Sequence, residues 1–145
     1  MLTRGGKIEQ MIRHASTYTL ENDLAAEGKD PMLLAQSPDD WREAEPALNR
    51  WIAATAHSLA QACVATMAVV EFDAVIIDGN FPAEVRQKLL AETRKEVARF
   101  DLRGLLSFAI EEGSIGRDAR ARGAAGLPLF ANFMIDRDVL FKELM

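Results

Sequence analysis

The sequence is poor in the residues that hold metals and disulfides, with one cysteine and two histidines among 145 residues. A single cysteine excludes an internal disulfide, and Cys63, His14 and His57 together are too few for a cysteine-rich zinc cluster. Cys63 lies in an apolar pattern of helical spacing, which predicts a buried, inert thiol. We therefore expect no metal centre and no cofactor.

The sequence also lacks an excess of positive charge and any long uninterrupted apolar run. Its 17 Lys and Arg residues against 22 Asp and Glu give a net charge of −5, which argues against a nucleic-acid-binding surface. Residues 1–7 lack the apolar core of a signal peptide. The low-charge stretch 51–70 contains His57, Ser58 and Gln61 and repeats its apolar residues at helical spacing, which predicts a core helix. We expect a cytoplasmic protein that does not contact membranes.

The most informative stretch of the chain is residues 72–84, which predicts a strand, a turn and a helix in succession. A β-branched run, 75–77, is typical of a strand buried on both faces. The turn-prone residues Asp78, Gly79 and Asn80 follow it, and Pro82 suits the first position of a helix. Ligands of open α/β folds bind at such carboxyl ends of strands, so we expect a ligand site at this turn.

The remaining pattern predicts a helix-rich α/β fold with one parallel βαβ unit packed by about five helices. Strands are expected at about 73–78 and 105–110, and the main helices at about 7–28, 46–71, 82–99 and 115–135. A two-stranded parallel sheet leaves both edges unpaired. We therefore expect missing sequence or a partner chain to complete it.

The last predicted helix is rich in small residues. Gly116, Ala119, Gly123 and Gly126 share one face, and glycine costs up to about 1 kcal/mol against alanine within a helix. This pattern predicts close packing against another element, or less often a flat ligand. Nearby arginines are expected to form local ion pairs on a solvated face; they are Arg117, Arg120 and Arg122.

Five segments, taken in order, carry a family resemblance. Residues 72–82 (FDAVIIDGNFP), 111–120 (EEGSIGRDAR) and 123–125 (GAA) resemble the C-terminal region of the ROK family, which groups bacterial sugar kinases with sugar-responsive transcriptional repressors. Residues 12–16 (IRHAS) and 39–41 (DDW) are similar to its transcriptional-regulator branch. The resemblance implies an actin-like, ribonuclease H-like fold, of which residues 1–145 would be a single partial domain without its N-terminal half.

The resemblance also implies site residues. The turn of Asp78, Gly79 and Asn80 matches the place where the family's kinases have a glycine-rich turn against the nucleotide. Two bulkier residues here would obstruct close backbone approach, and Asp78 would repel phosphates, which argues against ATP. By the same resemblance Glu9 corresponds to a sugar-contacting glutamate, whereas its residue type alone indicates a solvated helix position.

Several elements of the family's kinases do not occur in these residues: the Asp-x-Gly-x-Thr phosphate loop, the Asn-Asp pair with the catalytic base, and the zinc motif. We therefore predict no catalytic residue. The favoured hypothesis is the effector-binding and dimerisation part of a sugar-responsive ROK-type transcriptional regulator, which would contact DNA only through an absent N-terminal domain. Its expected partners are a sugar effector and either a second copy or the missing half. The alternatives are the C-terminal half of a ROK-type carbohydrate kinase and a stand-alone dimerising remnant.

Overall fold

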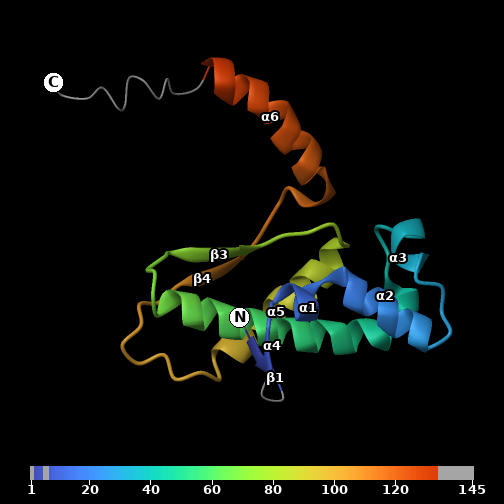
Figure 1. Cartoon of the computed structure of the whole chain (residues 1–145), viewed down its shortest axis with the longest axis horizontal. Coiled ribbons are helices and arrows are strands. Elements are labelled where there is room, and N and C mark those ends of the chain that lie inside the picture. Colours follow the sequence, from blue (N-terminus) through green and yellow to red (C-terminus); the bar gives the residue numbers. More distant parts are fainter. Residues whose placement is uncertain (1, 5–6, 134–145) are drawn as a thin grey trace.

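A long helix, α4 (Ala47–Met67), forms the spine of the molecule in the computed structural model, which describes residues 2–4 and 7–133 (Figure 1). Helices α1 (Ile12–Ala15), α2 (Thr17–Ala26) and α5 (Ala83–Val97) pack against it. Its apolar stripe is buried as predicted, and includes Leu48, Trp51, Ile52, Ala56, Ala60, Cys63 and Met67. The predicted burial of the Cys63 thiol is thereby confirmed.

Smaller elements connect these helices. An antiparallel hairpin of β1 (Leu2–Arg4) and β2 (Lys7–Glu9) precedes α1. Between α2 and α4 lie the single-turn helix α3 (Leu33–Gln36) and the 3₁₀ turn η1 (Arg42–Ala44). The 3₁₀ turn η2 (Gly116–Asp118) leads into α6 (Ala119–Phe133), the last described element.

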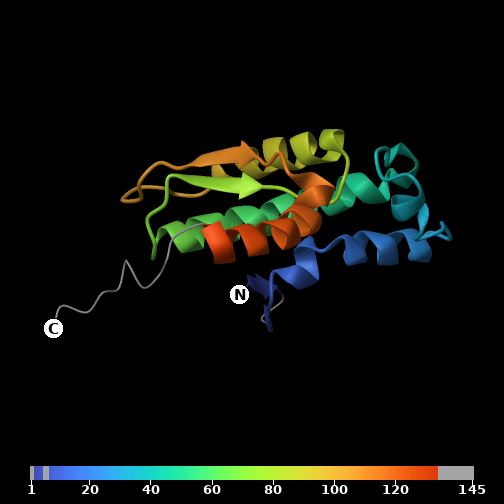
Figure 2. The same ribbon diagram turned by 90° about the horizontal axis from the view of Figure 1, so that it is seen from above.

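The predicted parallel βαβ unit is present. Strands β3 (Ala74–Ile77) and β4 (Ala109–Glu112) pair in parallel through the crossover helix α5, from Ala74 opposite Ala109 to Ile77 opposite Glu112. Helices α4 and α5 lie against one face of this sheet (Figures 1 and 2), where Ile77 and Ile110 are buried. The other face carries exposed Ile76 and its cross-strand neighbour Glu111. The described residues are therefore a helix-rich α/β fold with a small, one-sided sheet.

The second strand begins later than predicted. The interval 105–110 is wrong, because residues 105–108 form a loop and the pairing starts at Ala109, whose amide donates to the Asp73 carbonyl at 2.8 Å. Phe108 turns aside to pack edge-on against Phe72, with ring centroids 5.1 Å apart. Hydrophobicity marks residues 105–108 as strand-like, but the short β3 offers only four pairing positions, and Glu111 and Glu112 occupy two of them.

The N-terminal helix predicted at 7–28 is also wrong, because the chain breaks at Ser16. This residue is extended, and its hydroxyl accepts the Tyr18 amide at 3.2 Å as the N-cap of α2. Its carbonyl accepts the indole N–H of Trp51 at 3.0 Å. A contact to a residue 35 positions away therefore outweighs the helical periodicity, and Glu9 lies in a strand instead of a helix.

Helix α6 does not show the close packing that its small residues predicted. It extends away from the body of the molecule (Figure 1), and a side chain at Gly123 would meet nothing within 4 Å. Among the described residues, η2 is its main neighbour. In the arginine cluster, Arg122 forms the predicted local ion pair with Asp118, whereas Arg117 pairs with Asp39, which lies 78 positions away in the sequence.

Candidate functional site

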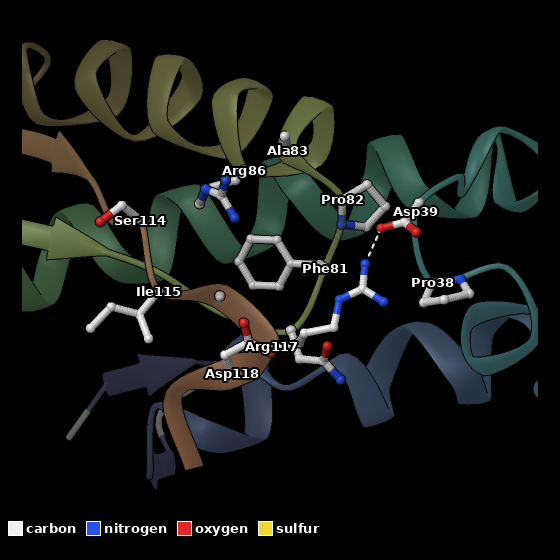
Figure 3. Close-up of a pocket in the computed structure, with 12 residues that line it drawn as sticks. Pro38, Asp39, Phe81, Pro82, Ala83, Arg86, Ser114, Ile115, Arg117 and Asp118 are labelled. Atoms are coloured by element: carbon white, nitrogen blue, oxygen red, sulfur yellow. Dashed lines mark hydrogen bonds and ion pairs between the residues drawn. The ribbon is translucent and has the colours of Figure 1, made fainter. Parts of the chain in front are cut away.

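The candidate site is a pocket of about 240 Å³ at the carboxyl ends of β3 and β4 (Figure 3). Three segments meet there: the loop before η1, the turn from β3 into α5, and the turn from β4 through η2. The residues that line it are Pro38, Asp39, Asn80, Phe81, Pro82, Ala83, Arg86, Ser114, Ile115, Gly116, Arg117 and Asp118. The pocket lies where the sequence predicted a ligand site.

Helix α5 begins beside this pocket. Pro82 is its N-cap, and no side chain caps the helix. The first helical hydrogen bond runs from the Arg86 amide to the Pro82 carbonyl, so the preceding amides have no partner within the helix. The positive end of the helix dipole is thus next to the pocket, where Ala83 forms part of the wall.

The carboxylate of Asp78 connects the backbone segments that form the site. It accepts the amides of Gly79 at 2.8 Å, Ile115 at 3.0 Å and Gly116 at 3.0 Å. These bonds join the end of β3 to the turn that follows β4. The amide of Gly116, then that of Gly79, lowers the pKa of Asp78, with smaller contributions from Ile115 and Arg86.

Two glycines permit this close approach. At Gly113 an added Cβ would collide with the Asp78 side chain, while the Gly113 amide donates to the Ile77 carbonyl at 2.8 Å. Gly116 has a φ of +57°, in the left-handed region that suits glycine. The turn over Asp78 is therefore encoded by the positions of these glycines.

The charged side chains of the pocket are paired. Arg86 donates from Nε to Glu112 at 2.8 Å, and its Nη1 lies 3.8 Å from Asp78. Arg117 pairs with Asp39 across the mouth, as the dashed line in Figure 3 shows. The lining thus holds two cations, Arg86 and Arg117, and two anions, Asp39 and Asp118, and is neutral overall.

Phe81 supplies an aromatic surface inside the pocket (Figure 3). Its ring packs against Trp41 and Trp51, with centroids 6.3 Å and 6.4 Å away. A side chain at Gly79 would collide with the same ring. Phe81 is thus held in place by the core on one side while it borders the pocket on the other.

The residues predicted from the sequence have different roles here. Asn80 lines the pocket, whereas Asp78 and Gly79 support residues that do. Asp78 accepts a hydrogen bond from the amide of Ile115, and Gly79 leaves room for the ring of Phe81. Glu9 lies in β2, with Oε2 3.0 Å from Nε2 of His14, and is not part of the described pocket lining.

Sequence reasoning missed Arg86, Phe81 and Asp39 as pocket residues. Arg86 lies one helical turn after Pro82, the predicted start of the helix. Its position close to the 78–80 turn could therefore have been predicted from residue spacing. Asp39 is brought in from far along the chain by the packing of the loop before η1, for which the sequence carries no signal.

Compared with known proteins, the chain matches no family model, no curated protein and no solved structure. The ROK resemblance therefore stays a prediction. Within residues 2–4 and 7–133, no group of three or more His, Cys, Asp or Glu side chains is arranged to hold a metal ion. The helices of this same part of the chain are each too short or too polar to cross a bilayer.

Proposed function

We propose that this chain is a ligand-binding module, the C-terminal effector-binding part of a sugar-responsive regulator of the ROK type, and that its pocket binds one neutral monosaccharide. The observation that carries this proposal is the neutral, fully paired lining of the pocket around an aromatic ring. The chain would then act by binding, with no catalytic step of its own.

The lining offers the groups that a sugar ring uses. Asn80 can both donate and accept, Ser114 adds a hydroxyl, and the lining also contains two carboxylates that accept and two guanidinium groups that donate. The negative face of an aromatic ring such as Phe81 attracts the polarised C–H groups of a sugar. At about 240 Å³ the pocket is smaller than the ~300–1,000 Å³ of drug-sized sites, which favours a single sugar ring.

The same lining favours a neutral ligand over a nucleotide. Phosphate sites combine helix N-termini with unpaired cations or a glycine-rich backbone cradle. Here Arg86 and Arg117 are each paired with a carboxylate, and Asp78 lies at the turn with a lowered pKa. The carbohydrate kinase alternative is for this reason the weaker one.

The proposal includes the larger fold. A two-stranded parallel βαβ unit with sheet edges unpaired by any other described strand is compatible with one part of an actin-like, ribonuclease H-like domain, whose missing strands would extend the sheet at an edge. DNA binding would belong to a domain outside this sequence, in agreement with the net charge of −5.

Titration calorimetry of the purified chain tests the proposal, with a panel of neutral monosaccharides, their phosphates and ATP. We expect a neutral monosaccharide to bind, and Asn80→Ala to weaken it about tenfold, since a buried hydrogen bond typically contributes ~1 kcal/mol or more. Asn49→Ala, an exposed asparagine on α4, is the matched control and should leave affinity unchanged.

Preferential binding of ATP would instead support the kinase alternative. Absence of binding by every sugar in the panel, with the chain folded by circular dichroism, would reject the proposal.

A further inference from the structure

One face of α6 carries a charged side chain together with exposed apolar side chains. This face is uncovered in the described structure. Arg120, Gly123, Leu127 and Phe130 recur at spacings of three and four, which places them on one side of the helix. Leu127 is 69% exposed and Phe130 is 62% exposed. The helix contains no acidic residue, so this face is basic at one end and apolar at the other.

The joint before α6 directs the helix away from its own sheet. The amides of Ile115 and Gly116 are held by the Asp78 carboxylate, and Arg117 pairs with Asp39. These contacts fix the chain immediately before α6 begins at Ala119. In this arrangement (Figure 1) α6 stands off from the body, and its apolar side chains Leu127, Leu129 and Phe130 are exposed.

A matching surface lies at β4. A groove of about 500 Å³ runs between the outer edge of this strand and the end of α5. Its lining is mostly apolar and consists of Val97, Ala98, Leu102, Phe108, Ala109 and Ile110, together with the charged residues Arg94 and Glu111. Glu111 and Ala109 also belong to the open face of the sheet, beside Ile76. At one point on the edge of β4 the carbonyl of Ile110 is not free to pair with an added strand, because it accepts a hydrogen bond from Nε of Arg94 at 3.1 Å.

The two surfaces are complementary in charge and chemistry. Glu111 has no ion-pair partner among the described residues, and neither has Arg120 at the start of α6. The groove also contains Arg94, whose guanidinium donates to the Ile110 carbonyl, so Glu111 is the charged group of the groove that is left to meet Arg120. Helices commonly dock into such grooves through side chains at i, i+3 and i+7.

We infer that two copies of this chain form a dimer by reciprocal exchange, in which the Arg120–Phe130 face of α6 from each copy occupies the β4 groove of the other. Two identical contacts of this kind close a two-fold symmetric assembly. The occupant is a second copy because the chain carries both surfaces and its fixed joint keeps them apart within one molecule. This inference does not depend on the ligand pocket.

Sedimentation velocity of the full chain tests the inference first. We expect a dimer whose dissociation constant rises about tenfold or more in Leu127→Lys, since a charge replaces a central apolar contact. Tyr18→Lys alters an equally exposed residue on α2, at 64% exposure, and should have no effect. A monomeric wild-type chain, or equal weakening by both variants, would reject the exchange.

Charge reversal tests the assigned pairing. Glu111→Arg and Arg120→Glu should each weaken the dimer, and the double variant should recover most of the lost affinity because the opposite charges meet again. Absence of recovery would show that these two residues do not face each other across the interface.

A cross-linking experiment distinguishes the exchange of α6 between two chains from the binding of α6 to the groove of its own chain. In a Cys63→Ala background, a chain carrying Ala109→Cys is mixed with a chain carrying Leu127→Cys and treated with a short bismaleimide. Exchange predicts a covalent dimer, and substitution of Tyr18→Cys for Leu127→Cys should abolish it. A cross-linked monomer from a diluted chain carrying both cysteines would show that α6 covers its own groove and would overturn the inference.

Discussion

Asp78 is the residue on which the candidate site depends most directly. Asp78 is itself an exposed residue, and its carboxylate accepts the amides of Gly79, Ile115 and Gly116. An unprotonated carboxylate accepts hydrogen bonds on both oxygens, whereas an amide side chain offers only one. Asp78→Asn should therefore lower the urea midpoint of unfolding, while Asp23→Asn, on the exposed side of α2, should not.

The pH dependence of stability has a defined sign at this residue. The folded state lowers the pKa of Asp78, so its contribution is present above the unfolded pKa of about 3.9 and is lost as pH falls through the lower folded value. Urea unfolding between pH 7 and pH 2 should show a decline below about pH 4 that is smaller in Asp78→Asn. An identical decline in both proteins would contradict this assignment.

Gly113 offers a second test at the same place. An added methyl group would collide with the Asp78 side chain, so Gly113→Ala should destabilise the fold by about 1–3 kcal/mol, as overpacking generally does. Ser107→Thr is the control, because it adds a methyl group at an exposed loop position. Thermal unfolding should show a lower midpoint for the first variant and no decrease for the second.

At the scale of elements, the packing of α5 onto the core supports both the sheet and the pocket. Leu89 is buried at 2% exposure in the middle of this helix. Leu89→Ala should cost about 2–5 kcal/mol through the lost apolar contact and the cavity left behind. Leu106→Ala removes a loop side chain that is 60% exposed and should change the free energy of unfolding by less than about 0.5 kcal/mol. Chemical denaturation followed by tryptophan fluorescence distinguishes them.

Some elements were predictable and others were not. Helices α4 and α5 were predicted to within a few residues, because long periodic segments are settled by local pattern. The start of β4 was not, since the residues before it are equally apolar and only pairing with β3 selects Ala109. The break at Ser16 likewise depends on the distant indole of Trp51.

For the whole molecule, the exchange of α6 predicts that stability depends on protein concentration. Association favours the folded state by mass action, so the unfolding midpoint of the full chain should rise with concentration. A chain that ends at Asp118 lacks α6 and should show a midpoint independent of concentration, with its core intact by circular dichroism. Equal behaviour of the two chains would contradict the exchange.

The sequence by itself determined the helix-rich α/β class, the parallel unit around α5, the turn between β3 and α5, and the burial of Cys63. These features follow from local periodicity, turn residues and the geometry of parallel strands. Tertiary structure alone decided that the hydrogen bonds of Asp78 support the pocket and that Asp39 becomes part of its lining. It also decided that α6 lacks the close packing against another element that its small residues predict. Each of these depends on contacts between residues far apart in the chain, and such contacts leave no local pattern in the sequence.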